Sequence, residues 1–332
     1  MYKRILISRT DSIGDVMLTL PMLVWIKQNF PDSEILYLGA SYTEPIISCF
    51  SVVDQFVNWT EMENSPSAQR IEILRDLNAD VIIHVFPVKE IAALAKKAKI
   101  PMRIGTSHRA FHLLTCNYRV NFTRKRSELH EAQLNFELLR PLGLTDIPTI
   151  DQLNNDVKAF KIPQVALPEA IAKSLFESEK SIILHPKSQG SAVEWPIEKY
   201  IELSTRLIDH GYTIFFTGTR AEGDLFRELL PKNERIIDTT GKLDLYQLIC
   251  FIGQVNALVA CSTGPLHIAG FTGIRAVGLF SPRKPIHPGR WGALGLNTKM
   301  LVYDENCPIC KKGKLCACIS DITVDKVYEA LN

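Results

Sequence analysis

Short apolar runs rich in Val, Ile and Leu alternate along the chain with longer segments in which apolar residues recur every three or four positions. This alternation predicts repeated strand–helix units, in which buried parallel strands are connected by amphipathic helices. The expected strands cover residues 4–8, 34–38, 53–59, 80–85, 181–185, 212–217, 256–260 and 276–280. The expected helices cover residues 15–30, 128–142, 197–210, 221–230, 245–251, 265–271 and 324–331.

The periodicity is lost between about residues 145 and 168, where Pro148, Pro163 and Pro168 occur. We place an interdomain linker there, since a chain of 332 residues is also longer than a single core usually supports. The pattern predicts two Rossmann-like, doubly wound α/β domains facing a central cleft, over residues 1–160 and 161–332. The last helix either stays in the second domain or packs back on the first. In such sheets ligands bind outside the carboxyl ends of the strands, so we expect the chemistry in the loops that follow them.

The composition is typical of a globular protein, with 46% hydrophobic and 22% charged residues. The apolar run at residues 5–7 is too short for a signal peptide. No stretch approaches the roughly 20 apolar residues that span a bilayer. We therefore expect a cytoplasmic protein, whose eight cysteines do not form a disulfide framework.

The loop after the first expected strand, residues 9–15, carries two acidic residues directly before a helix. Ser12 and Asp15 have the spacing of a capping box, which is a purely structural interpretation. In the functional interpretation, Asp15 lies at the carboxyl edge of the sheet and accepts a proton from a substrate hydroxyl. Gly14 then lets the substrate approach the backbone. The two interpretations are compatible.

A glycine–proline turn follows the expected strand at 256–260 and runs from Ser262 to His267. A helix N-terminus of this kind binds anions, so the Thr263 hydroxyl and the local amides are candidates to bind a diphosphate. The alternative is an ordinary strand–turn–helix unit. In the loop after residues 181–185, Lys187 is the nearest cation that could neutralise a diphosphate, and the alternative for it is a solvated surface charge.

Residues 5–16, ILISRTDSIGDV, and the TLP at 19–21 resemble the opening of the ADP-heptose:lipopolysaccharide heptosyltransferases, glycosyltransferase family 9. The turn from Thr263 to His267 resembles a second motif of that family, Asp-Ser/Thr-Gly-Pro-x-His. The resemblance implies a GT-B fold and an inverting glycosyltransferase. Its reaction would move a heptose or related sugar from a nucleotide diphosphate donor, ADP-heptose or similar, to a lipopolysaccharide core or other glycolipid acceptor. The resemblance further implies that Asp15 is the general base and that catalysis needs no cofactor.

The resemblance also extends to other loops of the second half. Glu222 aligns with a family glutamate near the donor, and residues 241–243 resemble the stretch that lies against the nucleobase. Ser262 and Val193 depart from the family, which carries aspartate and lysine there, and they support an alternative function as a non-catalytic nucleotide-sugar-binding protein. An NAD-dependent oxidoreductase is disfavoured, because the first loop lacks the G-x-G-x-x-G fingerprint. The residues expected to bind the donor are Lys187, Glu222, Gly241, Lys242, Leu243, Ser262, Thr263, Gly264, Pro265 and His267.

No acidic residue occurs between positions 91 and 127, where nine Lys or Arg residues are interleaved with apolar side chains. Such a one-sided run implies a local positive potential, although many charge runs are only solvated faces. We expect an acidic glycolipid acceptor and peripheral contact with an anionic membrane surface, at the inner face of the plasma membrane. Nucleic acid is disfavoured, because no recognised binding module is present. The residues expected to bind the acceptor are Ser12, Gly14, Arg103, Arg109 and Arg124.

Four of the eight cysteines crowd near the end of the chain, at Cys307, Cys310, Cys316 and Cys318. Four thiols at this spacing could surround one structural zinc ion tetrahedrally, and the lysines between them would offset the negative charge. An iron–sulfur cluster is less favoured. The remaining alternative is four reduced thiols, or two pairs, in a loop. The family resemblance does not extend to this cluster.

Overall fold

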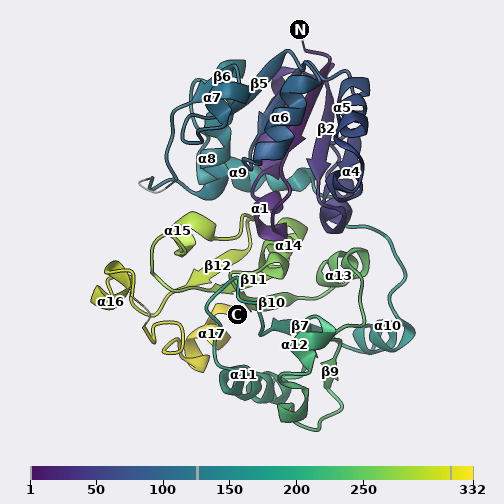
Figure 1. Ribbon diagram of the computed structural model, residues 1–332. Coiled ribbons are helices and arrows are strands. Elements are labelled where there is room, and N and C mark those ends of the chain that lie inside the picture. Colours follow the sequence, from purple (N-terminus) through teal and green to yellow (C-terminus); the bar gives the residue numbers. More distant parts are fainter. Residues whose placement is uncertain (1, 125–126, 315, 332) are drawn as a thin grey trace. The chain divides into compact units, whose positions relative to one another are not determined.

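The computed structural model describes residues 2–124, 127–314 and 316–331 of the chain (Figure 1). The chain separates into two compact units, Met1–Lys161 and Ile162–Asn332. Each unit contains a six-stranded, fully parallel sheet with its own buried core. Among the helices of the described ranges, none combines the length and the apolar character needed to cross a membrane.

The sheet of the first unit has the strand order β3-β2-β1-β4-β5-β6. This is the order of doubly wound folds, in which the direction of winding reverses between the first and fourth strands. The loop after β1 therefore opens at the switch point, beside β4. The strands are β1 (Arg4–Ser8), β2 (Glu34–Gly39), β3 (Gln55–Asn58), β4 (Val81–His84), β5 (Met102–Thr106) and β6 (Tyr118–Val120).

Apolar side chains from alternate strand positions bury one face of this sheet against helices. Leu6 and Ile82 belong to one buried cluster with Leu74 of α5 and Leu94 of α6. On the central strands the burial is two-sided, because Ile5 and Ile7 are also fully buried. The helices of this unit are α1 (Ile13–Met17), α2 (Leu20–Asn29), α3 (Glu44–Ser48), α4 (Trp59–Glu63), α5 (Ser67–Asp76), α6 (Lys89–Lys97), α7 (His112–Thr115), α8 (Glu131–Phe136) and α9 (Ile150–Asp156).

Two helices of the first unit that were expected as continuous are divided in the structure. The expected helix 15–30 is α1 followed by α2, with Pro21 at the second position of α2, where a missing amide costs nothing. The expected helix 128–142 begins at Glu131 and continues after α8 as a 3-10 turn, Glu137–Leu142, which contains Pro141. The first division matters for function, because it makes α1 a separate turn that carries Gly14 and Asp15.

The sheet of the second unit, read from β9, has the order β9-β8-β7-β10-β11-β12, which repeats the arrangement of the first. Its switch point lies between β7 and β10, so the loops after these two strands lie side by side. The strands are β7 (Lys180–His185), β8 (Tyr212–Phe216), β9 (Ile236–Asp238), β10 (Ala257–Cys261), β11 (Arg275–Leu279) and β12 (Thr298–Leu301).

One face of the second sheet is covered by α11 and α17. Leu203 and Val327 share a buried cluster with Ile182 and Val259 of the sheet. The apolar face of the last helix therefore packs within its own unit. The expected helix 221–230 is a short α12 followed by a 3-10 turn, Arg227–Leu229. The helices are α10 (Glu169–Phe176), α11 (Ile197–Asp209), α12 (Arg220–Gly223), α13 (Leu245–Ile252), α14 (Gly264–Thr272), α15 (Pro288–Trp291), α16 (Pro308–Lys311) and α17 (Val324–Leu331).

Candidate functional site

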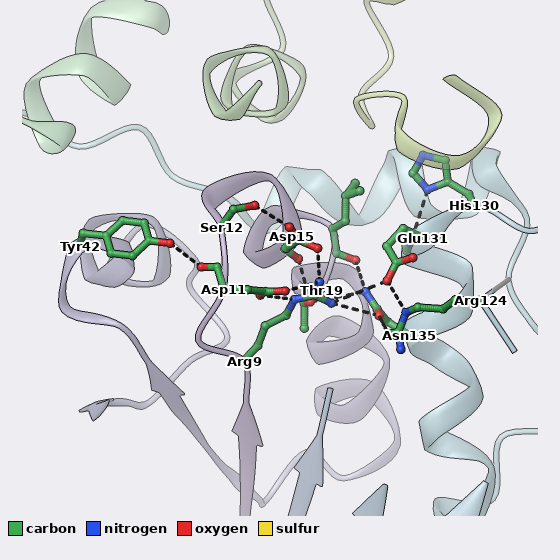
Figure 2. Close-up of polar contacts among 12 residues, drawn as sticks. Arg9, Asp11, Ser12, Asp15, Thr19, Tyr42, Arg124, His130, Glu131 and Asn135 are labelled. Atoms are coloured by element: carbon green, nitrogen blue, oxygen red, sulfur yellow. Dashed lines mark hydrogen bonds and ion pairs between the residues drawn. The ribbon is translucent and has the colours of Figure 1, made fainter. Parts of the chain in front are cut away.

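A buried arginine organises the carboxyl edge of the first sheet. Arg9 follows β1 directly, and 3% of its side chain is exposed. Its Nε donates to Asp11 Oδ1 at 2.8 Å and its Nη2 donates to Asp11 Oδ2 at 3.0 Å, so this pair is bidentate. The same Nη2 also contacts Asp15 Oδ1. Figure 2 shows the two carboxylates drawn together on one guanidinium.

Asp15 lies in α1, and its second carboxylate oxygen meets a hydroxyl. Ser12 Oγ donates to Asp15 Oδ2 at 2.5 Å (Figure 2). Ser12 is the N-cap residue of α1, but its side chain accepts no hydrogen bond from a helix amide, so the predicted capping box is not formed. About a fifth of the Asp15 side chain, 21%, remains exposed. Gly14 precedes Asp15 in the same short helix and adds no side chain there.

A second layer, contributed by α8 and the loop before it, surrounds Arg9. Arg9 Nη1 donates to Asn135 Oδ1 at 3.2 Å and lies 4.0 Å from Glu131 Oε1. Asn135 in turn donates to the Leu18 carbonyl at 3.0 Å. Both Glu131 and Asn135 are buried, so residues about 120 positions away in the chain hold the β1 loop in place.

Burial and neighbouring charges shift the pKa values of Arg9 and Asp11 in this cluster. Burial disfavours a charged guanidinium, but the carboxylates of Asp11, Asp15 and Glu131 outweigh it, so the pKa of Arg9 is raised. Burial also raises the pKa of Asp11 to about 6, an effect that Arg9 opposes and Asp15 reinforces. Asp11 therefore titrates close to physiological pH.

The three arginines expected to bind the acceptor occupy different environments. Arg124 donates to Glu131 Oε1 at 2.8 Å and joins the cluster around Arg9. Arg103 lies near the start of β5, away from the carboxyl edge, and its Nε donates to the Thr115 carbonyl at 2.7 Å. Arg109 follows β5 and is exposed. The Arg103 side chain therefore donates to the backbone, and its role in binding an acceptor stays a prediction.

In the second unit, the glycine–proline turn forms the N-terminus of α14, as expected. Thr263 is the N-cap residue, and Gly264 and Pro265 are the first two helical residues. The buried Thr263 Oγ1 has no hydrogen-bond partner among the described residues. His267 is buried one turn further along, and Ser262 is half-buried at the end of β10. A buried hydroxyl at a helix N-terminus is an arrangement that suits an anionic ligand.

The loop after β7 lies beside this turn, since the Trp195 amide donates to Cys261 Sγ at 3.3 Å. Lys187 Nζ lies 2.9 Å from Glu194 Oε2, so its charge is already paired. Although burial disfavours the charge of Glu194, hydrogen bonds from Lys187 and Ser188 lower its pKa. Val193, at the position where the family carries lysine, packs against the core of this unit.

His185 ends β7, and Glu222 lies in α12, which follows the neighbouring strand β8. The Glu222 carboxylate accepts from the Thr219 amide at 2.7 Å in a capping box of α12. His185 contacts Thr217 Oγ1 through Nδ1 at 2.9 Å. Burial lowers the pKa of His185 to about 4, against the opposing effect of Glu222, so this imidazole is neutral at pH 7.

Residues 241–243 form a tight turn after β9. Gly241 has φ +70°, and a Cβ there would lie 2.8 Å from Arg220 Cβ, so the position requires glycine. Lys242 Nζ donates to the Asp238 carbonyl at 2.6 Å, and Leu243 is half-buried. The loops after β7, β8, β9 and β10, which hold the expected donor-binding residues, therefore open at one edge of the second sheet.

Several residues of these sites were missed from the sequence. Arg9 stands between a buried strand and Asp11, and this sequence of a cation and an acid after a strand could have indicated an ion pair. His185 ends a strand in the same way. Glu131 and Asn135 carried no local signal, because only the tertiary fold brings α8 to the β1 loop.

The comparisons with known proteins identify both a family and a fold. The model of glycosyltransferase family 9 (heptosyltransferase) matches residues 69–318. Lipopolysaccharide heptosyltransferase 3 of Escherichia coli is 23% identical over 281 residues, covering 80% of this chain and 79% of that protein. The structure of E. coli ADP-heptose lps heptosyltransferase II has a TM-score of 0.75 at 19% identity, covering 99% and 97% of the two chains. The structure of E. coli heptosyltransferase WaaC with ADP-2-deoxy-2-fluoro heptose has a TM-score of 0.71 at 19% identity, covering 98% of each chain. The chain therefore has the GT-B fold.

Proposed function

Because the chain belongs to glycosyltransferase family 9, the heptosyltransferase family, we propose that this glycosyltransferase builds the core of a lipopolysaccharide or a related glycolipid. The donor is a nucleotide diphosphate sugar, ADP-heptose or a close relative. Two similarities support this proposal: the E. coli relative is a lipopolysaccharide heptosyltransferase, and the matching WaaC structure carries an ADP-heptose analogue.

In the proposed mechanism, Asp15 is the general base for an inverting transfer. The acceptor hydroxyl gives its proton to the Asp15 carboxylate, its oxygen bonds to the anomeric carbon, and the bond from that carbon to the diphosphate oxygen breaks. The hydrogen bond from Ser12 Oγ to Asp15 Oδ2 at 2.5 Å supports this role, because that oxygen already accepts from a neutral hydroxyl, as it would from the acceptor. Asp11 is the poorer choice, because the charged guanidinium of Arg9 binds both of its oxygens, whereas it contacts Asp15 through Oδ1.

We propose that the carboxyl edge of the second sheet binds the donor. The N-terminus of α14 and the Thr263 hydroxyl would face the diphosphate, and Lys187 would turn from Glu194 toward the developing charge. Fixed donors of this kind take the place of a catalytic metal. Glu222 and residues 241–243 would border the nucleoside, because their loops follow the next two strands of the sheet.

We also propose peripheral contact with an anionic membrane at the cytoplasmic face. Residues on and around α6 and α7 support this proposal, since Leu113 and Leu114 are 58% and 75% exposed. Lys96 Nζ donates to the Leu114 carbonyl at 2.7 Å, so basic and apolar side chains share one surface. Lys97, on α6, and Arg109, shortly before α7, are also exposed.

One observation carries the catalytic proposal: Asp15 is a partly exposed carboxylate held at a sheet edge by Arg9 and Ser12. Asp15→Asn should lower kcat for sugar transfer from ADP-heptose by about 100-fold or more, because general-base catalysis contributes that much. Stabilisation by ADP in a thermal-shift assay should be unchanged. Asp32→Asn, which changes an exposed carboxylate outside both proposed sites, is the matched control and should leave both readouts unchanged.

The same assay tests the alternative function. A protein that binds ADP but shows equal, background-level turnover in the wild type and in Asp15→Asn is a non-catalytic binder. That result would overturn the catalytic proposal while leaving the nucleotide site intact.

A further inference from the structure

Four cysteine sulfurs gather at one point in the second unit. The Sγ atoms of Cys307, Cys310, Cys316 and Cys318 all lie within 4.8 Å of one another. Cys307 precedes α16, Cys310 lies within it, and the other two follow in the next turns. None of these four cysteines lies in the donor-binding loops described above.

The spacing of the sulfurs suits a single ion. Four thiolates at about 2.3 Å from one tetrahedral zinc are about 3.8 Å apart. The Cys307–Cys316 separation of 3.9 Å matches that distance, whereas the Cys310–Cys316 separation of 2.8 Å is shorter and would widen when the two sulfurs bind one ion. An iron–sulfur cluster places several irons and sulfides between the thiolates, and so holds them further apart than this group allows.

Among the described residues of segment 307–318, the buried cluster consists of the cysteines themselves. Cys307, Cys310 and Cys318 are buried, whereas Ile309, the aliphatic residue between the first two, is 47% exposed. Gly313, at φ +71°, allows the tight turn that returns the chain toward the first pair. A segment with buried cysteines and an exposed aliphatic side chain is typical of folding around a metal rather than around an apolar core.

The surroundings also suit a thiolate site. Four thiolates and one zinc carry a net charge of −2, and Lys311, Lys312 and Lys314 lie within the same segment. The Cys318 amide points at Cys316 Sγ at 3.5 Å. Ser281, in the loop after β11, contacts Cys310 Sγ at 3.6 Å. The segment is thereby fastened to a loop at the carboxyl edge of the second sheet.

From this geometry we infer that Cys307, Cys310, Cys316 and Cys318 bind one zinc ion. The ion is structural: it folds residues 307–318 and anchors them to the loop after β11. It has no part in the transfer reaction, so this inference stands independently of the proposed activity.

The test is the metal content of the full chain, purified in reducing buffer without chelator. We expect about one zinc per chain in the wild type and less than about a tenth of that in Cys316→Ser. Cys250→Ser is the matched control, because Cys250 is a buried cysteine of the same unit whose thiol contacts the Val165 carbonyl. It should retain the full zinc content.

Cobalt provides a second readout if the Cys316→Ser chain does not fold. Wild-type protein refolded with Co²⁺ should show the intense visible and charge-transfer absorption of a tetrahedral cobalt thiolate, which added Zn²⁺ abolishes. The inference is overturned by wild-type protein that lacks zinc, by stoichiometric iron, by a Cys310–Cys316 disulfide under reducing purification, or by octahedral cobalt spectra.

Discussion

At the scale of single residues, Arg9 decides the chemistry of the β1 loop. A guanidinium shared by Asp11 and Asp15 keeps two acids close together without strong repulsion, and Asn135 and Glu131 fix its orientation. The sequence led to Asp15 through a motif. It did not lead to the partners of Asp15, because the side chains that hold Arg9 come from a helix distant in the sequence.

The pH dependence of activity should report on Asp11, whose pKa is about 6. Between pH 7 and pH 5 its carboxyl changes from about nine-tenths ionised to about one-tenth ionised. Protonated Asp11 no longer shares the charge of Arg9, so Asp15 becomes a weaker base and kcat/KM should fall by up to about tenfold. The measurement is the kcat/KM profile of sugar transfer from pH 5 to 8.

Asp11→Asn is the informative variant for that profile, because an amide imitates the neutral carboxyl. Its kcat/KM should be low and independent of pH across the same range. If kcat/KM of this variant still falls between pH 7 and pH 5 as in the wild type, another group is responsible for the titration. Titration of Asp11 itself does not destabilise the fold over this range. Since the folded pKa of Asp11 lies above its ordinary value of 3.8, the contribution of this group to stability is largest below about pH 4 and is lost as the pH rises through 6.

At the scale of elements, the apolar pattern predicted the central strands well. The expected strand 4–8 has the observed bounds, and those at 34–38 and 212–217 differ from β2 and β8 by one residue. The pattern missed β5, β6, β9 and β12, which lie toward the outer parts of their sheets and are three to five residues long. The divided helices were missed for another reason: local hydrogen bonds, such as Thr19 Oγ1 to the Asp15 carbonyl, end α1 within an unbroken apolar pattern.

The N-terminus of α14 allows a test in which stability and binding move in opposite directions. Thr263→Val removes a buried hydroxyl that has no partner among the described residues, so the ligand-free protein should be equally stable or up to about 1 kcal/mol more stable. Affinity for ADP should fall by about tenfold if that hydroxyl binds the diphosphate. Thermal unfolding and calorimetric titration measure the two quantities.

Thr239→Val is the matched control for this element. Thr239 is also buried, but its Oγ1 donates to the Phe216 carbonyl at 2.8 Å. The control should therefore lose about 1 kcal/mol of stability and keep its affinity for ADP. Equal ADP affinity in wild type and Thr263→Val would exclude the hydroxyl as a ligand.

At the scale of the whole molecule, the positive charge is concentrated in one part of the sequence although the net charge is small. The net charge is only +2, so nonspecific attraction to an anionic surface is weak. The acid-free run from 91 to 127 nevertheless lies entirely in the first unit, and Lys125 and Arg126 of that run lie outside the described residues. The two units have the same strand order, so their topology does not distinguish them. The positive run does, and it is the reason that our proposal assigns membrane contact to the first unit.

Vesicle binding tests whether the positive charge of the first unit, rather than the net charge of the protein, attracts an anionic membrane. Lys97→Glu with Arg109→Glu reverses two exposed charges of the acid-free run, whereas Lys173→Glu with Lys232→Glu makes the same change of net charge on exposed residues of the second unit. With about 1 kcal/mol per basic residue, the first pair should weaken binding to vesicles rich in anionic lipid by tenfold or more at low salt. The second pair should bind like the wild type, and high salt should release all three, because screening shortens the reach of surface charge. Equal weakening by the two pairs would mean that net charge, and not the surface formed by α6 and α7, governs the contact.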